Sequence, residues 1–270
     1  MESFLEAGQE IAREAGALLA GYYKRRIGYR LKGAYDLVTE ADVASEKLVM
    51  ERLSAHFPGH AVVAEESGEH QRGAEYCWYV DPLDGTTNFA HGFPAFCVSM
   101  GLERAGEPIA GIIYDPLRDE MFTAGRGTGA WLNGARLEVS KAARLADCLV
   151  ATGFPNRNRH QSINVHFYHQ LAMATHGVRR AGSAALDLAY VAAGRLDAFW
   201  EFGLNSWDMA AGVLMVTEAG GRRSDMHGEP HSLTSPTMLV DNGLVHEEML
   251  ELFAEIFTGH YRVPMPTVNG

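Results

Sequence analysis

The chain has 270 residues, of which 47% are hydrophobic and 21% are charged. This globular composition excludes a disordered or fibrous protein. The 23 Lys and Arg residues against 34 Asp and Glu residues give a net charge of −11. A protein whose main ligand is nucleic acid needs surplus positive charge, so we expect no nucleic-acid partner. An acidic chain can still bind a phosphate ester if metal ions supply the positive charge.

The N-terminal segment and the cysteines indicate where the protein works. Charged side chains interrupt the apolar positions of the first 26 residues, which argues against a secretory signal peptide. No apolar run approaches the roughly 18 residues that a membrane span needs. Cys77, Cys97 and Cys148 are too widely spaced for a Cys-x-x-Cys metal site or a disulfide framework. We therefore expect a cytoplasmic protein with reduced thiols and no membrane partner.

The first half of the chain predicts two helices followed by a sheet. Apolar positions recur with the helical period over residues 2–26, and a second helix is expected over 40–56 after a capping-box-like Thr39. Short apolar strands are expected at 61–64 and 77–80, each running directly into acidic residues. Alternation from residue 96 to 139, with Asn133-Gly134 as a hairpin turn, predicts a meandering antiparallel sheet.

Strands and helices alternate in the second half of the chain. A layered α+β or α/β sandwich follows from this order. We expect one domain over 1–270, with sub-domains of roughly 1–145 and 146–270. The expected strands are 149–152, 197–201 and 237–240, and the expected helices are 162–175, 183–193, 208–219 and 246–257, before an extended tail.

Three acidic motifs contain the candidate catalytic and metal-binding residues of the sequence. An apolar strand ends in Asp81-Pro82-Leu83-Asp84-Gly85, where Pro82 would fix the backbone of a turn between two carboxylates. A second strand ends in Glu65-Glu66, and Asp208 opens an apolar helix. Taken singly, these motifs are also explained as a tight turn, a solvated loop and a helix cap.

Taken together, the acidic motifs predict a metal site. Open sheets place ligands at strand ends, where several of these carboxylates would meet and repel one another unless cations lay between them. Oxygen ligands without His or Cys favour Mg²⁺ or Mn²⁺ over Zn²⁺. A pair of divalent ions bridged by a carboxylate is the usual device for transferring a phosphoryl group to water.

Five segments resemble the motifs of the inositol monophosphatase family, in the same order and over nearly the whole chain. Residue 83 is Leu where the family more often has Ile. The segments are Asp36-Leu37-Val38-Thr39 with Asp42, Glu65-Glu66-Ser67, residues 81–89, Gly182-Ser183-Ala184-Ala185, and residues 207–212.

The resemblance implies a role for each matching residue. Two or three Mg²⁺ ions are expected, with Mn²⁺ as an alternative. Glu65, Asp81 and the Leu83 carbonyl would hold the first ion, Asp81, Asp84 and Asp208 the second, and Glu65 would help to place a third. Thr86, paired with Asp42, would orient and help to deprotonate the attacking water, steered also by Glu65. The backbone of residues 83–86 (Leu83, Asp84, Gly85 and Thr86) would hold the phosphate, and Gly182, Ser183, Ala184, Glu201 and Asp208 would face the alcohol.

The resemblance also implies a fold and an activity. The family has an αβαβα layered fold, here with an antiparallel N-terminal sheet and a mixed C-terminal sheet, and is typically Mg²⁺-dependent, lithium-sensitive and dimeric. The implied reaction is hydrolysis of inositol 1-phosphate to myo-inositol and phosphate, by in-line attack of a metal-activated water.

Three alternatives remain open on the sequence. A zinc hydrolase could use His166 and His169, although no third ligand is evident. A non-catalytic regulatory or scaffold protein could share the fold. Related phosphatases act on fructose 1,6-bisphosphate, histidinol phosphate, NADP or 3′-phosphoadenosine phosphates. A second phosphate would require more basic residues than Arg157, Arg159, Arg179 and Arg180, and Arg179-Arg180 is expected to end a strand or to lie at a subunit contact. We also leave open the roles of Lys32 and of the loop at 153–160.

Overall fold

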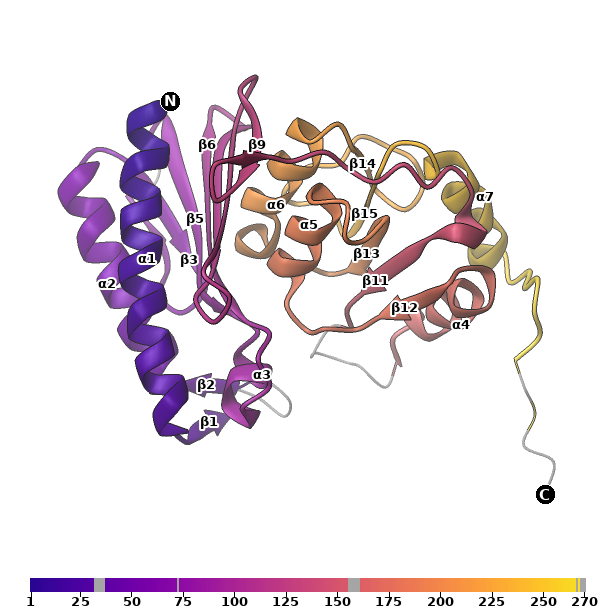
Figure 1. Ribbon diagram of the computed structural model, residues 1–270, viewed down its shortest axis with the longest axis horizontal. Helices are drawn as coiled ribbons and strands as arrows, with labels where there is room; N and C mark the ends of the chain where they lie inside the picture. Colours follow the sequence, from indigo (N-terminus) through magenta and orange to yellow (C-terminus); the bar gives the residue numbers. More distant parts are fainter. Residues whose placement is uncertain (32–36, 72, 155–160, 266, 268–270) are drawn as a thin grey trace.

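Three helical layers alternate with two sheets in the computed structural model, which describes residues 1–270 except 32–36, 72, 155–160, 266 and 268–270. Helices α1 (Glu2–Arg25) and α2 (Glu40–His56) cover the outer face of an eight-stranded sheet (Figure 1). Helices α5 (Ala184–Ala192) and α6 (Ser206–Glu218) lie between the sheets, and α4 (Asn164–Ala174) and α7 (His246–Phe257) cover the five-stranded sheet. The predicted αβαβα sandwich is confirmed.

The outer helices follow the sequence pattern closely. Helix α1 buries Ile11, Ala15 and Leu19 against the sheet, and α2 begins at the predicted capping box of Thr39 and Asp42. In the chain between these helices, β1 (Tyr29–Leu31) and β2 (Leu37–Thr39) pair antiparallel, and this pair was not expected from the sequence. None of the described helices combines the length and the apolar composition that crossing a membrane would require.

The eight-stranded sheet is antiparallel except at one pair. Strand β3 lies parallel to β5, because the chain passes through β4 at the sheet edge before β5 forms on the other side of β3. The antiparallel meander predicted over residues 96–139 is confirmed, and the parallel pair lies before it in the chain. The strand order is β10-β9-β8-β7-β6-β5-β3-β4, with bounds β3 (Ala61–Ala64), β4 (Gly68–His70), β5 (Tyr76–Asp84), β6 (Cys97–Arg104), β7 (Glu107–Asp115), β8 (Glu120–Gly125), β9 (Gly129–Leu132) and β10 (Ala135–Arg136).

The acidic segment of β5 forms a bulge in the strand and not the turn that its composition suggested. Asp81 pairs with Ser99 and Asp84 with Cys97, so two residues of β5 lie opposite one residue of β6. Pro82 lacks an N–H group and cannot complete the hydrogen-bond ladder at this point. The bulge therefore ends regular pairing where the two carboxylates leave the strand. Helix α3 (Thr86–His91) follows at once.

The five-stranded sheet is mixed, as predicted. Strand β11 is parallel to β12 and β13, whereas β15 is antiparallel to β13 and β14. A short 3-10 helix at Leu145–Asp147 precedes strand β11 in the chain. The strand order is β12-β11-β13-β15-β14, with bounds β11 (Leu149–Thr152), β12 (Gly177–Arg179), β13 (Ala198–Phe202), β14 (Arg222–Ser224) and β15 (Thr237–Asp241).

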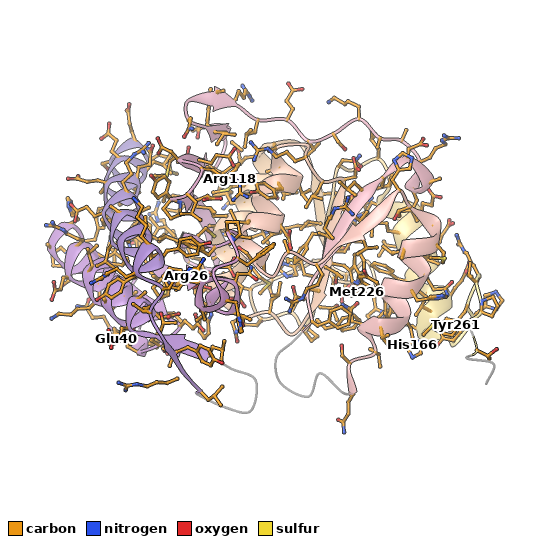
Figure 2. The ribbon with its side chains drawn as sticks, turned by 60° about the horizontal axis from the view of Figure 1, so that its bottom comes forward. Arg26, Glu40, Arg118, His166, Met226 and Tyr261 are labelled. Carbon is orange, nitrogen blue, oxygen red and sulfur yellow. The ribbon has the colours of Figure 1, made fainter. Side chains whose placement is uncertain are left out.

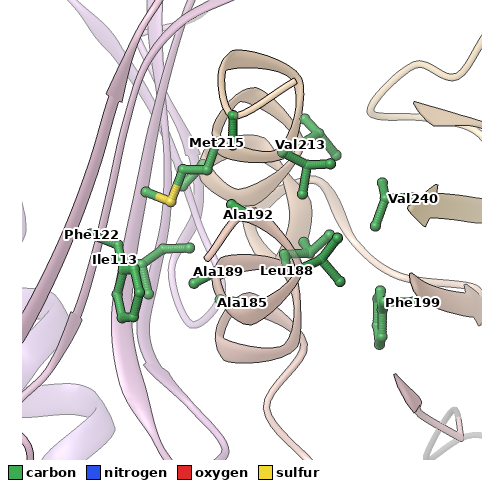
Figure 3. Packing of buried hydrophobic residues seen from close by; sticks show 14 of the residues in the cluster. Ile113, Phe122, Ala185, Leu188, Ala189, Ala192, Phe199, Val213, Met215 and Val240 are labelled. Carbon is green, nitrogen blue, oxygen red and sulfur yellow. The ribbon is translucent and has the colours of Figure 1, made fainter. Parts of the chain in front are cut away.

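The middle helical layer is apolar on both sides because a sheet covers each of them. Figure 3 shows Met215 toward Ile113 and Phe122 of the larger sheet, with Val213 toward the smaller sheet. A helix that is buried on every face carries apolar residues on every face, which explains the apolar runs in the sequences of α5 and α6. This cluster joins residues from both halves of the chain.

Two glycines of the larger sheet allow α6 to lie directly on it. A Cβ atom at Gly101 would stand 2.5 Å from the Ala210 Cβ, and one at Gly111 would stand 2.7 Å from the Ala211 carbonyl oxygen. Both distances are too short for a real contact. The close packing sets the first turn of α6, and with it Asp208, against the end of β5.

We predict that Gly111→Ala destabilises the fold by about 1–3 kcal/mol, because the added methyl group meets helix backbone that cannot yield cheaply. Urea unfolding measures the change. Gly21→Ala is the matched control, since Gly21 lies in α1 with open space around its Cα, and alanine there should be neutral or stabilising. Equal stability of the Gly111 variant and the parent would contradict this account of the α6 contact.

Candidate active site

A cavity of about 530 Å³ opens where the ends of β5 and β13 meet the starts of α3, α5 and α6. Its described lining holds six carboxylates and a single guanidinium group. Among the motif residues, Gly85 takes a φ of 95°, and a Cβ there would stand 2.7 Å from the Ala95 carbonyl oxygen. The six acids are Glu65, Asp81, Asp84, Asp187, Glu201 and Asp208, and the guanidinium belongs to Arg180.

Asp81 lies at the centre of this acidic group. Its side chain is buried, and its Oδ1 accepts a hydrogen bond of 2.9 Å from the Leu83 N–H. Burial raises the pKa of Asp81 well above its usual value, and the negative charges of Glu65, Asp84 and Asp208 raise it further. The bulge of β5 thus places one carboxylate within the electrostatic reach of three others.

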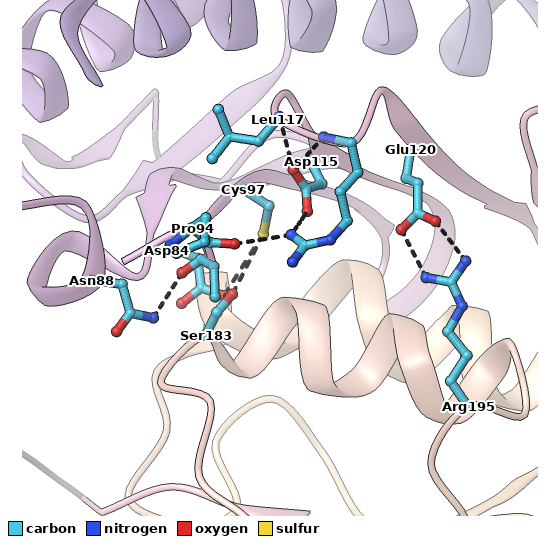
Figure 4. Close-up of polar contacts among 11 residues, drawn as sticks. Asp84, Asn88, Pro94, Cys97, Asp115, Leu117, Glu120, Ser183 and Arg195 are labelled. Carbon is cyan, nitrogen blue, oxygen red and sulfur yellow. Dashed lines mark hydrogen bonds and ion pairs between the residues drawn. The ribbon is translucent and has the colours of Figure 1, made fainter. Parts of the chain in front are cut away.

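Asp84 is fixed by the start of α5. Its Oδ2 accepts hydrogen bonds from the Ser183 hydroxyl at 2.6 Å and from the Ala185 N–H at 2.8 Å, and the Cys97 thiol lies 3.8 Å away (Figure 4). Burial raises the pKa of Asp84, while these donors lower it. The side chain of Ser183, which the resemblance assigned to the substrate, therefore binds Asp84 in this structure.

Asp208 reaches the cavity as part of a helix cap. Helix α6 begins two residues earlier than predicted, at Ser206, because Asn205 is the N-cap and Asp208 is the third residue of a capping box. The Asp208 Oδ2 accepts a 2.7 Å hydrogen bond from the Asn205 N–H. Burial and the charge of Asp84 raise the pKa of Asp208 to about 7. The capping explanation and the metal explanation of this residue are compatible.

Glu65 lines the same cavity from the end of β3. Its N–H donates to the Val80 carbonyl at 3.2 Å, which continues the pairing with β5. The next amide, of Glu66, donates to the Glu46 Oε2 at 2.8 Å, so a buried acid of α2 holds this turn. The parallel pairing of β3 and β5 is what brings Glu65 beside Asp81.

Thr86 and Asp42 are joined as a pair. The Thr86 hydroxyl lies 2.8 Å from the Asp42 Oδ1 and 3.0 Å from the Leu83 carbonyl oxygen. The Asp42 Oδ2 accepts from the N–H and the hydroxyl of Thr39, at 2.7 and 2.6 Å. The capping box of α2 therefore orients the carboxylate that contacts Thr86.

The opposite wall of the cavity comes from the second half of the chain. Gly182, Ser183, Ala184 and Glu201 all line it. The Asn88 side-chain amide of α3 donates to the carbonyl oxygens of Ala181, at 2.8 Å, and of Ala95, at 2.7 Å. Asn88 thus links the loop before α5 to the 81–89 motif, a role that the sequence did not predict.

Several lining residues were not named as site residues from the sequence, among them Asp187, Arg180 and Gly153. Asp187 lies on α5 one turn after the Ser183-Ala184 motif, and Arg180 ends the segment after β12 that was expected at a strand end or a subunit contact. Gly153 follows β11. Burial and the charge of Asp84 raise the pKa of Asp187, while Arg180 lowers it. The spacing of Asp187 from Ser183 on one helix was the available signal.

Several residues of the sequence hypotheses lie elsewhere. His166 stacks on Tyr261 at 5.2 Å between ring centroids, at the edge of the molecule (Figure 2), and His169 contacts Gln170. Neither histidine lines the cavity, so the structure gives the zinc hypothesis no support. Lys32, Asp36, Arg157 and Arg159 lie outside the described residues. The three cysteines are free thiols, of which Cys97 and Cys148 are buried.

The donor set fits hard divalent cations. Asp81, Asp84 and Asp208 each give one oxygen to a hydrogen bond from the protein, which leaves the second oxygen of each for a cation. Carboxylate oxygens without soft donors suit Mg²⁺ and Mn²⁺. In the described part of the chain, no group of three or more His, Cys, Asp or Glu side chains already encloses a metal position.

Comparisons with known proteins agree with this geometry. The model of the inositol monophosphatase family matches residues 1–260. An inositol-1-monophosphatase of Mesorhizobium japonicum is 41% identical over 93% of each chain. A protein named Nus factor SuhB, of Pseudomonas aeruginosa, is 46% identical over 90% of this chain and 92% of its own. The structure of inositol monophosphatase from Anabaena (Nostoc) sp. PCC 7120 is 43% identical over 93% of this chain and 94% of its own, with a TM-score of 0.85.

The chain belongs to the inositol monophosphatase family. It is a phosphatase of that fold, from a metal-dependent family that acts on phosphorylated small molecules.

We predict that Ser183→Ala lowers the free energy of unfolding by about 1–3 kcal/mol, because it removes a donor from the buried Asp84 carboxylate. Chemical denaturation without divalent ions measures this loss. Ser54→Ala, at an exposed position of α2, is the control and should change stability by less than about 0.5 kcal/mol. Similar effects of the two substitutions would argue against Ser183 as the support of Asp84.

Proposed function

We propose that the protein hydrolyses the phosphate monoester of a polyol, with inositol 1-phosphate as the substrate of choice, using bound Mg²⁺. The observation that carries this proposal is the ratio of six carboxylates to one guanidinium around the cavity. A phosphate dianion would be repelled from such a lining. Divalent cations would offset most of this negative charge and give the phosphate oxygens positive partners in the same cavity. The acidic net charge of the chain fits the same mechanism.

The proposed ligands divide between two ions. Glu65, Asp81 and the Leu83 carbonyl would hold the first, and Asp81, Asp84 and Asp208 the second, so that Asp81 bridges. Support comes from the electrostatic coupling of Asp81 to Glu65, Asp84 and Asp208. When bound, such cations neutralise the phosphate oxygens and make water more acidic. A looser third ion near Glu65, or Mn²⁺ in place of Mg²⁺, would need no other residues.

Thr86 and Asp42 would position the attacking water. Because the Thr86 hydroxyl donates to Asp42, its lone pairs can accept a hydrogen bond from a water molecule in the cavity. The water proton then has a route through Thr86 to the Asp42 carboxylate. The new P–O bond forms from this water while the ester P–O bond breaks on the opposite side, and the departing alcohol oxygen takes a proton from solvent. No covalent intermediate with the protein is required.

The alcohol of the substrate would lie against Gly182, Ala184, Glu201 and Asp208. Glu201 is the clearest polyol contact, because it is a buried acceptor at the wall opposite β5. Arg180 is the one described basic residue of the lining, which favours a monophosphate over a bisphosphate. The backbone of residues 83–86 (Leu83, Asp84, Gly85 and Thr86) would face the phosphate.

The resemblance to the family further suggests a cytoplasmic homodimer that is inhibited by lithium. Exposed apolar side chains on and beside α4 support a subunit contact in that region. They are Ile163, Val165, Tyr168 and Met173, with exposed fractions of 50%, 45%, 36% and 58%.

Asp84→Asn should lower kcat at least about 100-fold with Mg²⁺ while the fold is retained, because one charge of the ion-binding group is lost. Without divalent ions its melting temperature should be no lower than that of the parent, since one repulsion is relieved. Asp119→Asn, at an exposed position in a turn, controls for the loss of one negative charge. Near-normal activity of the Asp84 variant would refute the site.

The same assay identifies the substrate. Phosphate release is measured with inositol 1-phosphate, fructose 1,6-bisphosphate, histidinol phosphate, NADP and 3′-phosphoadenosine 5′-phosphate, with and without Li⁺. We expect the highest kcat/KM for inositol 1-phosphate and inhibition by Li⁺. A higher kcat/KM for another of these compounds would make that compound the preferred substrate and would leave the proposed metal-dependent hydrolysis unchanged. No Mg²⁺-dependent release from any of the five would leave a non-catalytic role as the better explanation.

A further inference from the structure

Gly153 and Glu201 lie side by side at the ends of two parallel strands. Thr152 of β11 pairs with Trp200 of β13, so the next residue of each strand, Gly153 and Glu201, enters the cavity together. Both residues are buried. The neighbour of the Glu201 carboxylate on this side is therefore the main chain at Gly153.

The Glu201 carboxylate occupies the place where a side chain at residue 153 would begin. A Cβ atom built on Gly153 would overlap three atoms of that group, Cδ, Oε1 and Oε2. The φ of Gly153 is not in the left-handed region, so any residue could adopt this backbone conformation. A side chain at residue 153 would therefore compete with the Glu201 carboxylate for the same space.

Hydrogen bonds tie the main chain at residue 153 to the neighbouring strand and to α4. The Gly153 carbonyl oxygen accepts a 2.7 Å hydrogen bond from the Asn164 side-chain amide, whose oxygen in turn accepts from the Trp200 indole N–H at 2.7 Å. The Thr152 hydroxyl donates to the Trp200 carbonyl at 2.6 Å. This network joins β11, α4 and β13, so a methyl group at residue 153 would displace the Glu201 side chain and not the strand.

The charges around Glu201 restrict where its carboxylate can go. Asp187 and Asp208 face it with like charge, and Arg180 is the opposing charge that acts on it. A displaced carboxylate would enter the cavity toward these acids, where the alcohol of the substrate is proposed to bind. The position of this carboxylate therefore depends on the absence of a side chain at Gly153.

We propose that Gly153 is a positioning residue, which sets the carboxylate of Glu201 and thereby the preference of the site for a hydroxyl-rich alcohol. The inference rests on the proposed function for the kinetic part alone. The steric coupling of Gly153 to Glu201 is a property of the fold and can be measured without substrate.

The first experiment is a double-mutant cycle of stability with Gly153→Ala, Glu201→Ala and the double variant, followed by urea unfolding. Gly153→Ala should destabilise the parent, whereas in the Glu201→Ala background it should have little or no effect, because the space is then free. Gly153→Ala combined with Ser54→Ala, at an exposed position of α2, is the control and should show no recovery. Equal destabilisation in the Glu201→Ala background would overturn the proposal.

The second experiment measures selectivity with Mg²⁺. For Gly153→Ala, kcat/KM for inositol 1-phosphate relative to that for 4-nitrophenyl phosphate should fall about tenfold, mainly through KM, because the second substrate has no polyol hydroxyls. In the Glu201→Ala background, Gly153→Ala should change this ratio by less than about twofold. An unchanged ratio in the single variant, or additive changes in the double variant, would overturn the specificity claim.

The two experiments separate the two proposals. If no substrate is hydrolysed by the parent protein, the proposed function fails while the stability cycle still decides whether Gly153 positions Glu201. If the stability cycle shows no coupling but the parent hydrolyses inositol 1-phosphate, the inference about Gly153 fails and the proposed function stands.

Discussion

The structure depends on bringing mutually repelling carboxylates to one point. Asp81 and Asp84 lie on β5, and Asp208 lies in the first turn of α6, more than a hundred residues later. Burial raises the pKa of all three, and repulsion by neighbouring carboxylates raises those of Asp81 and Asp208 further. Such an arrangement costs folding free energy in the absence of a partner. Hydrogen bonds to one oxygen of each group offset part of that cost, and divalent cations would offset the rest.

The architecture pays this cost through the central helical layer. Helix α5 supplies the donors that hold Asp84, and α6 carries Asp208 as part of its own cap. Both helices are anchored by apolar packing against two sheets, and Gly101 and Gly111 set how closely α6 approaches. The apolar core thus fixes the acids in positions that their own interactions would not favour.

Much of this could be predicted from the sequence, because the signals are local. The helical period of residues 2–26, the capping box at Thr39 and the acidic ends of strands each depend on a few neighbouring residues. The bulge at Pro82, the parallel pairing of β3 with β5, and the inclusion of Gly153 in the cavity depend on contacts between distant segments. Local sequence patterns do not encode such contacts. The composition of residues 81–85 predicted a turn where the structure has a bulge.

The most direct test of the central claim is a crystal structure of the protein grown with Mn²⁺, using anomalous scattering to locate the ions. The account predicts Mn²⁺ between the carboxylates of Asp81, Asp84 and Asp208, with a second ion toward Glu65. Ordered protein with Mn²⁺ bound only elsewhere, or with the Asp208 carboxylate turned away from the ion, would contradict it.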